Sequence, residues 1–350
     1  IVNQNDREAV VETGAYLSLK NGNVAALNRN VKNSALRDDV LDVDYVAVCS
    51  ALVRANAIAT VGLMDERYFL LWDDMDWGAS FKRHGYRVVC ALGSIVYHPA
   101  FTEKRSLVVD NYYGIRNPLL TISKHTKGFT RIQGLFNILG RAAGIASLFS
   151  LNGQKKAAGL CFQATRDFLT NAWGQVGALP SLENLHKCMT VPLSELYRKK
   201  VLVLPTGNGD EINCLGEMAS DFRQNGGKLY LLIQKDRREL FEDKGFDEII
   251  EFEADMISHP FLTIKSYLKI FRLNFDAAIK PSLSKVNLFS YAVRKVYVLA
   301  DNKIETQKTR EGLFALPAFL LLLSMLMIVI ILVLPLFYIK SNQYYSQQEV

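Results

Sequence analysis

The stretch that decides the fold is Met64–Pro99, MDERYFLLWDDMDWGASFKRHGYRVVCALGSIVYHP. An apolar run leads into a cluster of acids, and the amphipathic segment after it predicts a helix over 74–84 that stops at Gly85. Apolar residues then predict a strand over 86–92 and a short second strand over 94–97. Strand, helix and strand in this order are typical of an α/β domain, whose ligands lie beyond the strand ends.

The cluster of acids has two interpretations. Three carboxylates lie within four positions of Trp72-Asp73-Asp74-Met75-Asp76-Trp77. As a helix N-terminus, Asp73 or Asp74 is the cap and Asp76 lies in the first turn, at the positive end of the helix dipole. As a functional site, carboxylates crowded at a strand end push each other's pKa values apart, so that one of them can serve as a base. Capping needs only one or two acids, and both interpretations stay open at this point.

A histidine, His98, follows the second expected strand, where a metal ligand is well placed in an α/β site. A lone histidine is also commonly structural or exposed. Trp72 and Trp77 likewise have two interpretations, because an indole offers a flat apolar face to a sugar or packs in the core.

Composition limits the classes of protein. The 350 residues and the 49% hydrophobic content fit two folded domains. A formal charge of +6 with scattered basic residues argues against a nucleic-acid partner. The five cysteines form no CxxC pair, so we expect small buried side chains rather than disulfides or a zinc site. The chain opens on Ile1 rather than on a methionine, so we expect a fragment of a longer protein. Its first residues show no signal-peptide pattern, which favours the cytosolic side.

Short elements are predicted upstream of the cluster. Alternating residues over 14–19 and 24–27, joined by Asn21-Gly22-Asn23, predict a hairpin. The continuous apolar run Tyr45–Val53 predicts a buried strand, and 54–61 predicts a short helix.

Downstream, 121–180 reads as a helical subdomain, with a basic segment followed by an apolar and an amphipathic one. Two interpretations remain for these helices. They form an ordinary helical subdomain, or they present an interfacial surface whose basic residues face the anionic lipids of the inner leaflet.

A linker is predicted over 181–198, after which the pattern restarts. A doubly wound α/β module with a parallel sheet is predicted over 199–302, from a helix over 211–225 and strands over 200–204, 228–233, 247–252, 276–280 and 295–300. The loop after the first strand, which contains Gly207, Gly209 and Asp210, suits a phosphate at a helix N-terminus. It lacks the third glycine of the dinucleotide fingerprint and the Gly-Lys-Ser/Thr of a P-loop.

The run 313–339 is apolar apart from Ser324 and exceeds the ~20 residues that span a bilayer, so it predicts a transmembrane helix before a tail over 340–350. More basic residues precede the run, namely Lys303, Lys308 and Arg310, than follow it, where Lys340 stands alone. This bias predicts a cytoplasmic N-terminal side, and hence soluble domains at the inner face of the cytoplasmic membrane.

Several ordered motifs resemble the acceptor half of family 2 glycosyltransferases, most closely the galactofuranosyltransferase and rhamnosyltransferase branches. They cover roughly residues 7–120 and comprise Val43-Asp44-Tyr45, Cys49 to Arg54, Val61 to Phe69, Trp72 to Trp77, His84 to Val89, Val96-Tyr97-His98 and Tyr112-Tyr113-Gly114-Ile115-Arg116-Asn117. The resemblance implies that 1–120 is the acceptor-side part of a GT-A domain.

The resemblance also implies an inverting, metal-dependent transfer of sugar from a nucleotide-sugar donor to a growing cell-surface glycan or a polyprenyl-linked acceptor. Asp74 matches the general base, and His98 matches a ligand of the divalent cation, Mg²⁺ or Mn²⁺. Trp72, Asp73, Asp76, Trp77 and Arg116 fall at positions expected to bind the acceptor.

This chain departs from the family in one respect. Members hold the metal mainly through an Asp-x-Asp motif upstream of the region that the chain matches, and residues 1–40 contain none. We therefore expect little activity from residues 1–350 alone. The alternative is a non-catalytic, membrane-anchored scaffold or acceptor-binding protein.

A second resemblance is confined to the module over 199–302. Its Val-Leu-Pro-x-Gly-Asn-Gly-Asp run is similar to the first strand and loop of heptosyltransferase-like GT-B enzymes. In those enzymes the acid after the last glycine, here Asp210, has a catalytic role.

Overall fold

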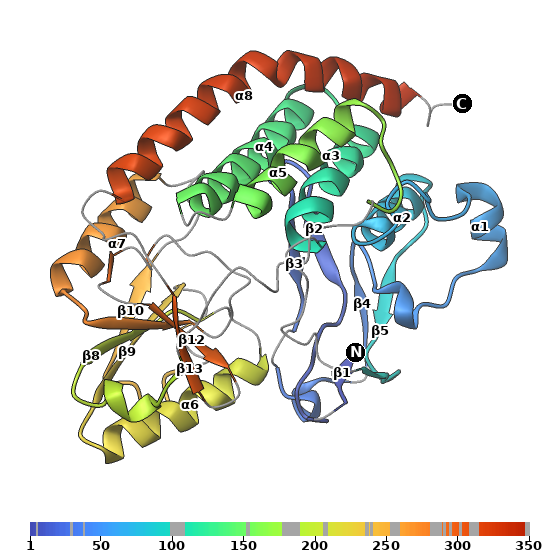
Figure 1. Ribbon diagram of the computed structural model, residues 1–350. Coiled ribbons are helices and arrows are strands. Elements are labelled where there is room, and N and C mark those ends of the chain that lie inside the picture. The colour runs from blue at the N-terminus through green and yellow to red at the C-terminus, as the bar shows by residue number, and fades with distance from the viewer. Residues whose placement is uncertain are drawn as a thin grey trace. The chain divides into compact units, whose positions relative to one another are not determined.

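A computed structural model gives the structure of the chain (Figure 1). It describes residues 1–4, 6–28, 31–37, 39–98, 109–151, 155–176, 190–205, 209–234, 238, 241–252, 260–280, 289, 292–293, 296–300, 303–307 and 315–346. These residues form a mixed α/β structure that divides into two compact units. Unit 1 comprises Ile1–Ala143, Gly159–Pro180 and Leu326–Val350, and unit 2 comprises Gly144–Ala158 and Ser181–Met325.

Unit 1 begins with short strands and two short helices. Their bounds are β1 (Val2–Asn3), β2 (Ala15–Ser18), β3 (Asn23–Ala26), β4 (Val40–Asp42), α1 (Ala55–Val61), α2 (Asp73–Arg83), β5 (Val89–Ala91) and β6 (Tyr97–His98). The hairpin β2–β3 and the helix of the acidic cluster, α2, are therefore confirmed. The strands pair two by two: β1 with β6 in parallel, and β2 with β3 and β4 with β5 antiparallel.

The strand predicted over Tyr45–Val53 is wrong. Tyr45 makes one bridge to Ala15, a 3₁₀ turn occupies Val48–Ser50, and Leu52 is fully exposed. An apolar run becomes a buried strand only where a partner strand covers it, and the described residues pair with this run only at Tyr45. Cys49 is likewise exposed, whereas Cys161 is buried as predicted.

Three helices follow, α3 (Gly114–His125), α4 (Gly128–Leu151) and α5 (Lys155–Leu169), and a π-helical turn over Val109–Tyr113 precedes the first. Helices are thus present in the region where the sequence predicted them, although Gly144–Ala158 belongs to unit 2. Within unit 1 their apolar faces form the core, with Leu119, Leu120, Ile122, Leu135, Ile138, Leu160, Ala164 and Phe168 almost fully buried. Gly78 of α2 lies against the backbone at Asp44. A side chain does not fit there, because a Cβ on residue 78 would lie 2.5 Å from the carbonyl oxygen of Asp44.

Unit 2 is built on a seven-stranded sheet in the order β10-β9-β8-β11-β12-β13-β7. Its elements are β7 (Thr190–Val191), β8 (Lys200–Val203), α6 (Gly209–Gln224), β9 (Lys228–Gln234), β10 (Glu248–Phe252), α7 (Pro260–Leu273), β11 (Ala277–Lys280), β12 (Val296–Ala300) and β13 (Lys303–Gln307). The five strands predicted from the sequence are present and parallel. Antiparallel β13 and β7, which the sequence analysis did not predict, extend the sheet at one edge.

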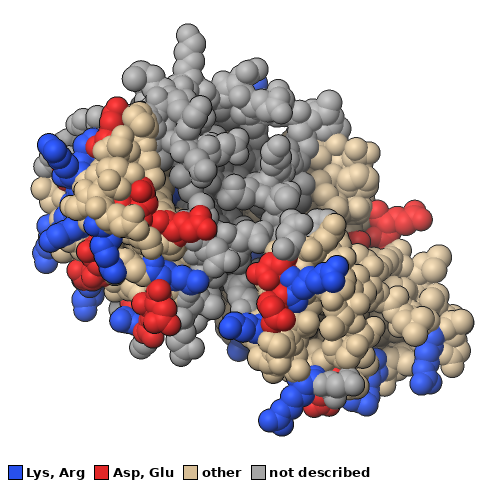
Figure 2. All heavy atoms as spheres, turned by 90° about the horizontal axis from the view of Figure 1, so that it is seen from below, with Lys and Arg blue, Asp and Glu red and all other residues tan. Residues whose placement is uncertain are grey.

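Alternate residues of these parallel strands face two separate cores. Val201 and Val203 lie in the core with α6, whereas Leu202 lies in the core with α7. One helix therefore covers each face of the sheet, as in doubly wound folds. On the surface drawn in Figure 2, basic and acidic side chains of the described residues are interspersed.

The apolar C-terminal run lies in a long helix, α8 (Ala315–Ser346). Its segment Leu320–Tyr344 and the helix α4 are each long and apolar enough to cross a membrane, and 11% and 56% of their most apolar windows are buried. Length and composition are weak grounds for a span, particularly for the more buried α4. In unit 1, one face of α8 packs through Phe337, whose ring stacks on Phe168 at 5.7 Å, while Ile331 and Leu332 are exposed.

Candidate active site

A loop in an unusual conformation leads into the acidic helix. Phe69, Leu71 and Trp72 have φ angles of 61°, 64° and 69°, in the left-handed region that residues other than glycine rarely adopt. Trp72 is the residue immediately before α2, and its side chain is buried. The backbone is therefore strained immediately before Asp73 and Asp74. Such strain persists only where surrounding contacts enforce it, and it is concentrated at functional sites.

Asp74 has the electrostatics of a base. It is half-buried, and its Oδ1 accepts a hydrogen bond from the backbone N–H of Met75 at 2.9 Å. Burial, together with the negative charges of Asp73 and Glu12, raises the pKa of Asp74 to about 6. A carboxyl group that titrates near neutral pH can accept a proton from a hydroxyl group more effectively than an ordinary aspartate.

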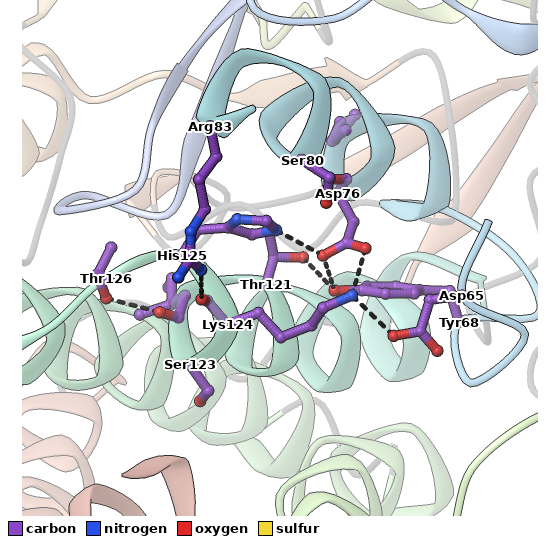
Figure 3. A network of polar contacts seen from close by, with 12 residues as sticks. Asp65, Tyr68, Asp76, Ser80, Arg83, Thr121, Ser123, Lys124, His125 and Thr126 are labelled. Carbon is purple, nitrogen blue, oxygen red and sulfur yellow. Dashed lines mark hydrogen bonds and ion pairs between the residues drawn. The ribbon is translucent and has the colours of Figure 1, made fainter. Parts of the chain in front are cut away.

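Asp76 lies at the centre of a buried polar network (Figure 3). Its Oδ1 accepts hydrogen bonds from the Tyr68 hydroxyl at 2.9 Å and lies 2.8 Å from His125 Nε2, and its Oδ2 pairs with Lys124 Nζ at 2.5 Å. Although burial alone would raise the pKa of Asp76, the His125 hydrogen bond and the Lys124 charge lower it. Asp76 is therefore an ionised anchor that joins α2 to the end of α3.

The same network includes the loop before α2. Lys124 Nζ also contacts Asp65 Oδ2 at 2.7 Å, and Arg67 makes a bidentate pair with Asp65. The Arg67 hydrogen bonds and the Lys124 charge outweigh the effect of burial and lower the pKa of Asp65. Tyr68 is fully buried, and burial and the charge of Asp76 raise its pKa well above the usual value. The two ends of segment 65–76 are thus fixed to α3 by charge pairs.

The tryptophans that flank the acids are held by protein contacts. Trp77 Nε1 donates to the carbonyl oxygen of Gly62 at 3.0 Å, and its ring lies 4.9 Å from the ring of Phe81. Trp72 is 7% exposed. Trp77 is only partly buried, so it keeps a surface that a sugar can reach, whereas Trp72 offers little.

Arg116, predicted to bind the acceptor, is completely buried. Its guanidinium donates to backbone carbonyl oxygens on two segments, Arg67 and Tyr68 before α2, and Ala172 and Gly174 after α5. Its described contacts are therefore with the protein itself. The acceptor-binding roles of Arg116, Asp73 and Asp76 stay predictions.

His98 lies in β6 and is paired in register with Asn3 of β1. Among the described residues, no group of three or more histidine, cysteine, aspartate or glutamate side chains is arranged to hold a metal ion. These residues therefore do not supply a complete site for the divalent cation that the family resemblance implies. The ligand role of His98 stays a prediction.

The second predicted site is only partly described. Gly209 is the first residue of α6, and Asp210 is the second. Gly207 lies outside the described residues, and so does the side chain of Asp210. The loop follows β8, where the strand order changes direction between β8 and β11. In open α/β sheets this is the usual place for a ligand.

Several residues of this region were missed from the sequence, namely Glu12, Asp65, Asn117, Lys124 and His125. A signal for three of them was present, because Asn117 ends the Tyr112–Asn117 motif, and Lys124 and His125 are polar or charged residues within the helical segment predicted over 121–180. Buried polar groups in such helices need partners, which marks them as network residues. Glu12 carries no comparable signal.

Asp74, a half-buried carboxyl group with a raised pKa at a helix start that follows a strained loop, is the candidate for an acid–base role. No protein-family profile matches the chain. A galactofuranosyltransferase of Mycobacterium tuberculosis, GlfT2, is 29% identical over 103 residues, which is 29% of this chain and 16% of that protein. The chain thus matches less than a fifth of that protein's length. This limited similarity relates part of the chain to glycosyltransferases.

Proposed function

We propose that unit 1 carries the acceptor side of an inverting family 2 glycosyltransferase of GT-A type. The raised pKa of Asp74, to about 6, is the observation that carries the proposal, because it gives the chain a base at the start of α2. The similarity to a galactofuranosyltransferase supplies the reaction class. The donor is a nucleotide sugar, and the acceptor is a growing glycan or a polyprenyl-linked glycolipid.

In the proposed reaction, ionised Asp74 takes the proton of an acceptor hydroxyl group as that oxygen attacks the anomeric carbon. The bond from this carbon to the diphosphate oxygen breaks in the same displacement. The nucleoside diphosphate leaves with the electron pair, and the configuration at the anomeric carbon inverts. Asp73, whose charge helps to raise the pKa of Asp74, favours uptake of the proton.

A divalent cation, Mg²⁺ or Mn²⁺, is part of the proposal, with His98 as its ligand from this chain. The other ligands are expected in an Asp-x-Asp motif upstream of Ile1. Residues 1–350 alone are expected to show little or no transfer.

The proposed location is the inner face of the cytoplasmic membrane. The most apolar 18-residue window within Leu320–Tyr344 of α8 has a mean hydropathy of 3.1, and we propose that this helix anchors the protein. The excess of basic residues before the helix supports a cytoplasmic position for the soluble domains. An acceptor attached to a membrane lipid would then lie close to the site.

The test is Asp74→Asn in the protein extended upstream to its expected metal-binding half. Loss of a general base lowers the rate of transfer by about 10²–10⁴-fold. Asp42→Asn is the matched control, since Asp42 makes an exposed pair with Arg87. Transfer at the wild-type rate by the Asp74 variant would refute the proposed base.

A non-catalytic scaffold is the second candidate. The absence of a metal-binding group among the described residues favours it. In that case the extended protein binds a glycan acceptor but transfers no sugar from any nucleotide-sugar donor. Direct measurement of transfer therefore separates the two functions.

A further inference from the structure

The left-handed loop before α2 has no glycine at its three left-handed positions, so contacts must hold its conformation. Phe69, Leu71 and Trp72 occupy these positions. The carbonyl oxygen of Trp72 accepts the Asp76 N–H at the start of α2, whereas the carbonyl groups of Arg67, Tyr68, Leu70 and Leu71 accept hydrogen bonds from side chains outside the loop. The adjacent helix α3 supplies these donors through two consecutive residues, Arg116 and Asn117.

Asn117 binds the loop with its amide nitrogen. Nδ2 donates to the carbonyl oxygens of Leu70 at 2.7 Å, Leu71 at 2.7 Å and Tyr68 at 3.0 Å. Its Oδ1 accepts a hydrogen bond from Arg116 Nε at 3.0 Å, which keeps the nitrogen directed at the loop. Asn117 is completely buried, so water does not replace these bonds.

Arg116 fixes the start of the same loop. One terminal nitrogen donates to the carbonyl oxygens of Arg67 at 3.2 Å and Tyr68 at 3.1 Å. The other donates to Ala172 at 3.2 Å and Gly174 at 3.0 Å, beyond α5. The guanidinium also lies over the rings of Tyr112 and Tyr113, each 5.1 Å from its centroid. Its planar shape is needed to reach both segments at once.

We infer that Arg116 and Asn117 are positioning residues that hold the loop 67–72 and thereby aim the carboxylates of Asp73 and Asp74. The inference rests on the proposed function, because it treats Asp74 as the base. The first residue of α2 follows the loop directly, so a change in the left-handed residues rotates the start of the helix. A displacement of about 1 Å is enough to lower a catalytic rate by about a hundredfold.

The test compares Asn117→Leu with Ser123→Ala in the extended protein. Leucine keeps the approximate shape of asparagine and removes the three hydrogen bonds that Asn117 donates to the loop. Ser123 is a matched control because it is also buried in α3 and makes an intrahelical bond, from Oγ to the carbonyl oxygen of Leu119 at 2.6 Å. Arg116→Lys is a milder second variant that keeps the charge and loses the planar fork.

We expect Asn117→Leu to lower kcat by about a hundredfold with KM for the donor nearly unchanged, and to speed amide hydrogen exchange in 67–73. Arg116→Lys shows the same changes with smaller size. Ser123→Ala changes neither quantity. If Asn117→Leu folds poorly, the split between kcat and KM in Arg116→Lys decides the question.

The outcomes separate this inference from the proposed function. If Asp74→Asn abolishes transfer but Asn117→Leu and Arg116→Lys keep the kcat of Ser123→Ala, the positioning role is refuted and the function stands. If the wild-type protein transfers no sugar, the function fails, and hydrogen exchange in 67–73 still judges the contacts. Exchange in Asn117→Leu equal to that in Ser123→Ala overturns the claim that Asn117 holds the loop.

Discussion

Replacing Asp76 with asparagine separates a structural role for this acid from acceptor binding. The carboxylate is 3% exposed and faces three side-chain partners, Tyr68, Lys124 and His125. The substitution removes the charge and leaves the buried Lys124 ammonium with Asp65 as its remaining acid. Removing one partner of a buried charge pair costs about 3–5 kcal/mol. We expect Asp76→Asn to lower the free energy of unfolding of unit 1 by about this amount.

Urea unfolding followed by tryptophan fluorescence measures this cost. The three tryptophans, Trp72, Trp77 and Trp173, all belong to unit 1, so their signal reports on that unit. A loss of about 3 kcal/mol lowers the urea midpoint by at least about 1 M. Asp42→Asn is the control, because the exposed pair that it breaks contributes about 0–1 kcal/mol.

The contribution of Asp76 to the free energy of unfolding should depend on pH. The pKa of Asp76 is lowered in the folded protein. Its contribution to stability is therefore complete above the unfolded pKa of about 4 and is lost as the pH falls through the folded value. The wild-type and Asp76→Asn stabilities should converge below about pH 4. A variant as stable as Asp42→Asn at pH 7, with a raised KM for the acceptor, would refute the structural role.

Two further predictions concern the base and the membrane. The rate of sugar transfer should fall as the pH drops below about 6, because Asp74 becomes protonated. Glu12→Gln removes a like charge and should shift this acidic limb of the pH–rate profile to lower pH. An acidic limb that does not move would contradict the contribution of Glu12. The protein should stay in membranes washed with alkaline carbonate, and arginine at the exposed positions Ile331 and Leu332 should release it, because each arginine costs about 2.5–3.5 kcal/mol at the centre of a span. Release of the unaltered protein by carbonate would instead show that α8 does not cross the bilayer.

The sequence was most informative where one local signal determined the element. The helix α2 has acids in its first turn and basic residues in its last, and the hairpin β2–β3 has a glycine turn, so both were predictable. The parallel strands of unit 2 were also predictable, because a strand covered on both faces is continuously apolar. The run Tyr45–Val53 has the same composition but lacks that cover, and it formed no strand.

The acidic cluster shows the limit of sequence analysis at the site. The spacing of Asp73, Asp74 and Asp76 on a helix was predictable, but their different environments were not. Asp76 points at Lys124 and His125, which lie 48 and 49 residues away in the chain. Asp74 lies near Glu12, far upstream. Such distant pairings depend on how α3 and the first strands pack, which no local pattern contains.

The different environments of these acids bear on both initial interpretations of the cluster. A helix start accommodates negative charge at its N-terminus, which explains why three acids are tolerated there. Lys124 and His125 compensate the charge of Asp76, whereas burial and the charges of Asp73 and Glu12 raise the pKa of Asp74. The anchoring of Asp76 and the contacts of Asn117 fix opposite ends of one segment, Tyr68 to Asp76. The prediction that Asp73 or Asp74 is the cap is wrong, because Trp72 is the N-cap of α2 and makes no side-chain cap bond. Acids in the first turn and proton transfer are nevertheless compatible, because the paired acid, Asp76, fixes the helix that carries the proposed base.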